Sequence, residues 1–288
     1  MLRGPVDAAN TVERYVRVTD PPRSVDDVLQ EIIVGENGLD PLDAADRVGA
    51  WKARFLSKLD HKKEQAIKSG SFLTFCFNST GANFIQGACF VEPRDTEAVK
   101  REKESRAKHE SYLDLFSELS PTEFEGLCGK VIHLLRVDEA SVTRASADQG
   151  VDFYGRLPLG SIIKPSEISP GAEKNLCAWI VGQAKHYQKT SVSTKDIREL
   201  VGSVELAKSK VFAGTADPLQ GLDIRVCDPV VFLFITTGRF TRDSRDLLAR
   251  SGVVSMDGIQ LSVFLADHEA AQDNGELALD ALQAWIIE

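Results

Sequence analysis

The spacing of apolar and polar residues predicts a helical N-terminal region that contains one pair of strands. The run SVDDVLQEII begins with Ser24 as an N-cap and has acids in its first turn, as is typical of a helix start. Apolar residues then recur every three to four positions from Pro41 to Gly70, which predicts one long amphipathic helix. Two apolar stretches flank the turn residues 78–83 and predict two strands. Residues 1–24 are polar and interrupted by proline, so we expect them to be irregular.

A charged run, DTEAVKREKESRAKHESYLDLFSEL, separates this region from the rest of the chain. Its charges alternate in sign, which indicates a solvated helix that links two units; a plain surface helix is the alternative to any role with nucleic acid. A new unit begins at Ser120, an N-cap followed by Pro121 and by Glu123 in a capping-box position. We therefore expect an N-terminal α+β accessory module of unknown role at 1–119 and a second domain at 120–288.

Strands and helices alternate in the second domain. Short strands are expected in DEASVTRA and GVDFYGRL, followed by a Pro/Gly/Ser-rich loop at 158–171 and the strand WIVGQAKHYQ. A helix at 194–213 precedes DPVVFLFITTG, a continuous β-branched and aromatic run suited to a strand buried on both faces. A helix at 241–250, a strand pair across VVSMDGIQLSV and a closing helix complete the chain. This order predicts an α/β fold with helices packed on a mixed sheet.

Net charge, apolar runs and cysteine content exclude only a few classes of protein. The formal net charge of -9 argues against a general polyanion-binding coat, but it leaves room for a local basic groove. The sequence has neither a run of about 18 apolar residues nor an N-terminal apolar signal segment, so we expect no membrane helix and no secretion. The five scattered cysteines suggest reduced thiols in a cytoplasmic protein, and they suggest neither a zinc site nor a disulfide framework.

The strand WIVGQAKHYQ turns polar in its middle, where Gln183 and Lys185 share one face. A solvated strand edge would explain this pattern, and an edge position would likewise explain Asp152, the only acid in GVDFYG. Together, however, the Asp152 carboxylate, the Gln183 side-chain oxygen and the Ala184 carbonyl can hold a divalent metal, and hard oxygen ligands suit Mg²⁺. Lys185 could then orient and stabilise a hydroxide that attacks a phosphodiester.

These residues carry a resemblance. From about Ser120 to Leu265 the chain resembles the catalytic domain of the Mrr family of restriction endonucleases. The resemblance is carried by Asp152, the QAKHY strand, the FE of PTEFEGL and the segment FITTGRFTRDSRDLLARSGVVSMDGIQL. The resemblance implies a restriction-endonuclease-like mixed sheet flanked by helices, from the PD-(D/E)xK nuclease superfamily. It implies Asp152 and Gln183 as metal ligands, Lys185 as the catalytic lysine and Glu125 as the helix acid beside them. A solvent-facing helix acid remains the alternative for Glu125.

Several side chains are candidates for contact with DNA. Lys195 and Arg198 belong to the helix after the site, and Arg239 and Arg242 follow the buried strand. The full set of candidates is Lys164, Lys195, Arg198, Arg239, Arg242 and the aromatic Tyr187. Tyr187 is equally explained as a rim aromatic, and the two later arginines as ordinary residues at a helix start.

The leading expectation is a cytoplasmic, Mg²⁺-dependent deoxyribonuclease (with Mn²⁺ as a second ion) that cleaves double-stranded DNA as a homodimer, in defence against foreign DNA. One alternative is a nuclease fold that serves as a DNA-binding or scaffold subunit, because the amide of Gln183 supplies no charge to a metal. Another is an RNase, or an effector nuclease switched by an activating ligand or partner protein through residues 1–119.

Overall fold

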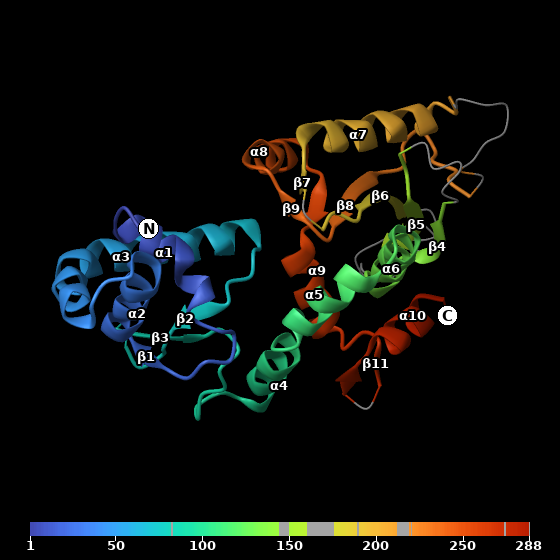
Figure 1. The fold of residues 1–288 in the computed structure, drawn as a ribbon. Helices are drawn as coiled ribbons and strands as arrows, with labels where there is room; N and C mark the ends of the chain where they lie inside the picture. Colours follow the sequence, from blue (N-terminus) through green and yellow to red (C-terminus); the bar gives the residue numbers. More distant parts are fainter. Residues whose placement is uncertain are drawn as a thin grey trace. The chain divides into compact units, whose positions relative to one another are not determined.

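The computed structural model describes residues 1–81, 83–143, 150–159, 176–188, 190–211, 219, 221–273 and 275–287. The chain divides into two compact units, 1–109 and 110–288, which are described separately below (Figure 1). The expected functional boundary between residues 119 and 120 stays a prediction. Within the described ranges, none of the helices is both long enough and apolar enough to cross a membrane.

The first unit packs helices around a small antiparallel sheet with strand order β1-β3-β2. Its core is formed by apolar side chains of the first three helices and of the sheet. Its elements are α1 (Pro5–Thr11), the 3-10 helix η1 (Val12–Arg14), β1 (Arg23–Ser24), α2 (Val25–Asn37), α3 (Pro41–Ser69), β2 (Phe75–Phe77), β3 (Phe84–Gly87) and α4 (Glu97–Arg106).

Local signals explain most of these elements. The Ser24 hydroxyl accepts a hydrogen bond from Asp27 N at 3.0 Å and caps α2. Helix α3 begins with Pro41 and ends at Gly70, whose φ of 64° favours glycine. These two helices and the β2–β3 pair confirm the expected elements. The expectation for residues 1–24 is wrong: the segment contains α1, because its buried alanines pack against the larger helices.

The second unit is built on a five-stranded mixed sheet with strand order β10-β8-β6-β5-β4. Strands β10, β8 and β6 run parallel, whereas β5 is antiparallel to both β6 and β4. This sheet, flanked by helices, confirms the predicted α/β fold class with its N-terminal α+β module. The strands are β4 (Asp138–Val142), β5 (Phe153–Pro158), β6 (Cys177–Lys185), β8 (Val230–Thr236) and β10 (Val254–Met256).

Two helical layers cover the sheet. Figure 1 shows α7 and α6 on opposite faces; α5, α6, α9 and α10 share one apolar core with the sheet, and α7 and α8 share the other. The elements are α5 (His109–Glu118), α6 (Pro121–Leu134), α7 (Thr194–Lys208), α8 (Arg242–Ser251), α9 (Gly258–Asp267) and α10 (Leu279–Ile287). Two short strand pairs complete the unit: β7 (Ser191–Val192) with β9 (Arg239–Phe240), and β11 (Gln272–Asp273) with β12 (Glu276–Leu277).

Three expectations for this half of the chain need correction. The charged run forms two helices, α4 and α5, and α5 buries Tyr112 and Phe116 in the core of the second unit. The second strand expected across VVSMDGIQLSV is instead helix α9, because Asp257 and Gln260 form a capping box. The closing helix is likewise divided, with the β11–β12 pair lying between α9 and α10.

Candidate active site

Strand β6 lies at the centre of the sheet, between β5 and β8, so it is not an edge strand. Trp179 and Val181 pack in the core under α7, whereas Ile180 and Ala184 pack in the core of α6. Because side chains alternate along a strand, Gln183 lies on the same side as Val181. Gln183 is only 1% exposed, which excludes the solvated edge considered above for this position.

Asp152 lies directly before β5 and contacts β6 through backbone and side chain. Its N–H donates to Gly182 O at 2.9 Å, and its Oδ2 accepts from Ala184 N at 2.7 Å. Strand pairing sets Phe153 opposite Gly182, so the register continues to Asp152 opposite Gln183. A Cβ on Gly182 would lie 2.2 Å from the Phe153 ring, and therefore only glycine permits this close approach. Asp152 is itself buried, with 3% exposure.

Gln183 has a buried acceptor without a donor in the described part of the chain. Its Oε1 is shielded from solvent and has no hydrogen-bond partner there. A buried polar atom of this kind is costly unless a ligand, an ion or water satisfies it. The amide oxygen therefore marks a position where a bound group would be stabilised.

Lys185 ends β6 and lies near the N-terminus of α7. Burial alone raises the pKa of Asp196, but hydrogen bonds from Ser193 and Tyr187 and the nearby Lys185 charge lower it below the ordinary value. Tyr187 donates its hydroxyl to Asp196 Oδ1 at 3.2 Å, and Ser193 donates both its backbone N–H and its hydroxyl to Oδ2 at 2.7 Å. Asp196 is thus an ionised neighbour of Lys185 that sequence reasoning missed. Its signal was the Ser-x-x-Asp capping pattern at 193–196.

The end of β8 fixes the backbone around Lys185. Thr236 Oγ1 donates to Lys185 O at 2.7 Å and accepts from Gly238 N at 3.0 Å. Thr237 Oγ1 donates to Tyr187 O at 3.3 Å and lies 3.1 Å from His186 Nδ1. These hydroxyls position the end of β6, a structural role that differs from the ligand-facing role such turns often have. The His186 ring packs against Phe124 of α6 with centroids 5.4 Å apart, as expected for the strand face opposite Lys185.

Glu125 of α6 and Asp152 both lie close enough to Cys128 for their charges to act on its thiol. Complete burial, followed by the charges of Asp152 and Glu125, raises the pKa of the Cys128 thiol well above its ordinary value. Both carboxylates therefore act on the same buried group, and Glu125 lies one helical turn before it. Glu125 is half-buried, in contrast to the fully solvated helix acid that was the alternative.

The donor set fits a divalent cation. In an antiparallel pair, the N–H and the C=O of one residue point toward the same neighbouring strand. The Ala184 N–H points toward the end of β5, so the Ala184 carbonyl does too. The Asp152 carboxylate, the Ala184 carbonyl and the unsatisfied Gln183 oxygen are hard ligands of the kind Mg²⁺ prefers. No group of three or more His, Cys, Asp or Glu that could hold a metal occurs among the described residues, so a metal here depends on the amide and backbone oxygens.

The candidate DNA-binding side chains are mostly exposed at one end of the sheet. Lys195 and Arg198 lie on the first turns of α7, Arg239 on β9 and Arg242 at the start of α8. The β7–β9 pairing sets Ser191 opposite Arg239, which brings the start of α7 close to β9. None of the four cations forms an ion pair within the described ranges. Lys164 lies outside the described residues.

Comparison with known proteins agrees with the resemblance stated above. Residues 116–217 match the Mrr_cat family model, described as a restriction endonuclease, and this confirms the predicted family resemblance for that segment.

Two solved structures are similar to the chain. The structure titled "MspJI Restriction Endonuclease in Complex with 27-mer Oligonucleotide" is 21% identical, with 69% of this chain and 39% of that chain covered and a TM-score of 0.41. The DNA modification-dependent restriction endonuclease AspBHI is 19% identical, with 73% of this chain and 46% of that chain covered and a TM-score of 0.39. The chain thus spans less than half the length of either. A search of curated proteins gives no match.

Proposed function

We propose that this chain is a divalent-metal-dependent endonuclease that hydrolyses phosphodiester bonds of DNA, and that it acts against foreign DNA. The observation that carries the proposal is the meeting of three groups at the end of β5 and β6. Asp152 is hydrogen-bonded to Ala184 N, Gln183 Oε1 lacks a donor in the described part of the chain, and Lys185 ends the same strand. The restriction endonuclease match at residues 116–217 supports the reaction class.

Each residue has a distinct proposed role. Asp152 and Gln183, with the Ala184 carbonyl, would hold the cation, which would polarise the scissile phosphate and stabilise its developing charge. Lys185 would donate hydrogen bonds to the attacking water and to the phosphate, and so orient the water in line with the scissile bond. Glu125 orients the groups around Asp152 from α6.

The residues around Lys185 fix its backbone and place an ionised carboxylate near its charge. Thr236 holds the Lys185 carbonyl at 2.7 Å, and the ionised Asp196 lies within reach of its charge. Preorganised charge of this kind lowers the cost of positioning a reactive group during the reaction. This arrangement supports a catalytic domain over the alternative of a nuclease fold that only binds DNA.

The same exposed cations would hold the phosphate backbone of a duplex. One site cuts one strand, so cleavage of both strands in one encounter favours a closed two-fold dimer, whose mass light scattering measures. The expected cytoplasmic location stays a prediction.

Incubation of the purified full chain with plasmid, methylated plasmid and RNA, with and without Mg²⁺, tests the proposal. We expect plasmid cleavage that requires Mg²⁺ or Mn²⁺ and stops with a chelator. Cleavage of RNA alone would establish the ribonuclease alternative. Metal-independent cleavage, or tight DNA binding without any cleavage under all conditions, would contradict the proposal.

A further inference from the structure

A surface cavity of about 410 Å³ lies in the first unit, on the β2–β3 hairpin and the loop that follows β3. Its apolar lining includes the rings of Phe84 and Phe90, and its polar lining includes Asn78, Glu92 and Arg94. All of these residues precede the nuclease-like unit. The cavity therefore shares no residue with the candidate active site.

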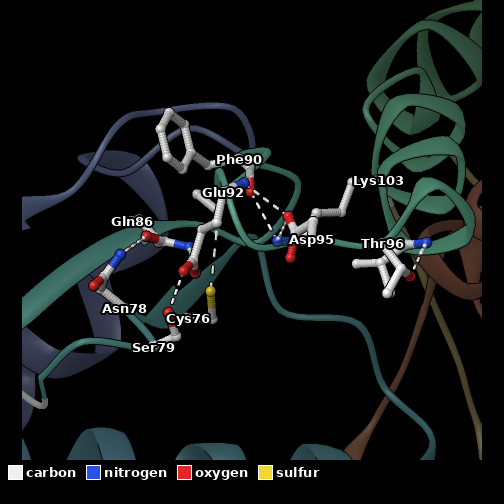
Figure 2. A network of polar contacts seen from close by, with 11 residues as sticks. Cys76, Asn78, Ser79, Gln86, Phe90, Glu92, Asp95, Thr96 and Lys103 are labelled. Atoms are coloured by element: carbon white, nitrogen blue, oxygen red, sulfur yellow. Dashed lines mark hydrogen bonds and ion pairs between the residues drawn. The ribbon is translucent and has the colours of Figure 1, made fainter.

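The polar wall of the cavity is fixed by a buried amide, Gln86, which is fully shielded from solvent. Gln86 Nε2 donates to Glu92 Oε1 at 2.7 Å, and Asn78 Nδ2 donates to Gln86 Oε1 at 2.5 Å (Figure 2). The Ser79 hydroxyl donates to Glu92 Oε2. The positions of Glu92 and Asn78 are thus set before any ligand binds, which reduces the entropic cost of binding.

The loop that carries Phe90 and Glu92 is anchored from α4. Lys103 Nζ donates to Phe90 O and to Asp95 Oδ2, both at 2.8 Å, and Asp95 Oδ2 also accepts from Glu92 N at 2.7 Å (Figure 2). A surface loop with this composition would otherwise have many conformations. The anchoring indicates a preformed concave site.

Glu92 keeps hydrogen-bonding capacity and charge for a ligand. The hydrogen bond from Ser79 lowers the pKa of the Glu92 carboxyl, so it is ionised at neutral pH. An ionised carboxylate accepts about four hydrogen bonds, and the Ser79 hydroxyl, the Ser79 backbone and the Gln86 amide use three of them. No ion pair involves Glu92 within the described ranges. A ligand with N–H donors would complete the set.

The rest of the lining selects among ligands with N–H donors. Phe84 is 45% exposed, an unusual state for a large ring on a small sheet, and Phe90 is half-buried. Aromatic rings of this kind stack with flat heterocycles. The exposed Arg94 would repel a simple ammonium ligand, but it would attract a ligand that also carries an anion. A nucleotide has both features: a flat heterocyclic base with N–H donors and an attached phosphate anion.

We propose that this cavity binds one nucleotide whose base carries an exocyclic amino group. The base stacks on Phe84 and Phe90, the amino group donates to Glu92, and the phosphate contacts Arg94. Adenine, cytosine and guanine provide such a donor, whereas uracil presents a carbonyl oxygen that the carboxylate would repel. The nucleotide is either free or an unpaired base of a DNA strand.

Calorimetric titration of the full chain, in the absence of metal, tests this inference. We expect CMP, AMP or GMP to bind at least about tenfold more tightly than UMP, since a lost carboxylate contact leaves the site unsatisfied. Arg94→Ala should weaken CMP binding but leave cytidine binding unchanged, and Arg54→Ala, an exposed arginine of α3, is the control. Repeating the titration in Lys185→Ala separates this site from the proposed catalytic function.

A second variant pair tests the stacking. Phe84→Ala should weaken nucleotide binding about tenfold, the lower range for one stacked base, whereas Leu42→Ala, a control that removes another exposed apolar side chain, should not. Competition by an oligonucleotide with one unpaired cytosine, but not by its fully paired form, would identify DNA as the source. Competition by neither would leave the free nucleotide as the ligand. Equal affinity for CMP and UMP, absence of binding, or unchanged affinity in Phe84→Ala would overturn the proposal.

Discussion

The Asp152 carboxylate accepts a hydrogen bond from the Ala184 N–H at 2.7 Å, across the end of two neighbouring strands. This contact ties the acid to the strand that carries Gln183 and Lys185. Because both partners are buried, the acid is held in place without any long flexible side chain. A change at either strand end will therefore affect the whole group.

The first prediction concerns the two residues with the most direct proposed roles. Asp152→Asn and Lys185→Ala should each lower the rate of plasmid cleavage by at least about a hundredfold, the usual scale for one acid–base group. Asparagine keeps an acceptor for Ala184 N, so the fold should persist, and thermal unfolding checks this. Lys208→Ala, at the far end of α7, is the matched control and should cleave normally. A Lys185→Ala protein with the wild-type rate would show that the assignment is wrong.

The second prediction concerns Glu125. If this acid orients the groups around Asp152, Glu125→Gln should raise the Mg²⁺ concentration for half-maximal cleavage about tenfold, the lower range for a residue that supports metal ligands. Calorimetric binding of Mg²⁺ provides a readout that does not depend on cleavage. Glu110→Gln, an exposed acid of α5, is the control. If Glu125→Gln changes neither the Mg²⁺ affinity nor the Mg²⁺ concentration for half-maximal cleavage, Glu125 has only a structural role.

Asp196 gives a prediction with a defined pH dependence. Although burial raises its pKa, hydrogen bonds from Ser193 and Tyr187 and the charge of Lys185 lower it overall. A carboxyl whose pKa is lower in the folded state stabilises the fold above its unfolded pKa, which is about 3.9 for aspartate. That stabilisation is lost as the pH falls through the lower, folded-state pKa.

Asp196→Asn should therefore be less stable than the wild-type protein at pH 7, and the difference should shrink as the pH falls below the unfolded-state pKa of aspartate, about 3.9. Urea unfolding at a series of pH values measures this difference. The same variant should lower kcat at least about tenfold with little change in KM, because Lys185 loses its positioning neighbour. A stability difference that is the same at every pH, together with a normal kcat, would remove Asp196 from the site.

The general form of the site could be predicted from the sequence because its signals are local. Alternation along β6 sets Gln183 and Lys185 on one face, and the capping box at Ser120 sets the start of the helix that carries Glu125. The pairing of Asp152 opposite Gln183 depends on strand register, for which the sequence offered only the resemblance. The roles of these residues stay predictions.

Other features depend on contacts that a pattern does not contain. Residues 1–24 read as irregular because α1 is only one short helix, stabilised by packing on α3 more than by its own composition. Helix α9 was not predicted because VVSMDGIQLSV is rich in strand-forming residues. The capping box that begins at Asp257 nevertheless starts a helix there. Asp196 was overlooked because its hydrogen bond with Tyr187 and the nearby charge of Lys185 depend on a strand end meeting a helix start.

The fourth prediction concerns the division of the chain. Helix α4 has no buried residue, whereas α5 buries Tyr112 and Phe116 in the core of the second unit. Limited proteolysis should therefore cut between residues 95 and 109 and release a stable C-terminal fragment that keeps α5. Mass spectrometry identifies the fragment and circular dichroism its folding. Resistance of this segment to protease, or loss of structure in both fragments after cutting, would indicate one integrated fold.

The last prediction concerns how a chain with a net charge of -9 binds a polyanion. Only a local group of cations can do so, and Arg239 and Arg242 are exposed near the end of β8. Each phosphate contact adds about 0.9 to the slope of log affinity against log salt for duplex DNA. Reversing both charges to glutamate should therefore weaken binding for every DNA sequence and reduce the slope by about 2, without changing which sequence is preferred. Titrations of catalytically inactive Lys185→Ala protein at several salt concentrations measure both quantities. Arg250→Glu, at the other end of α8, is the matched control. An affinity that does not depend on salt, or an equal effect of the control, would show that DNA is held elsewhere.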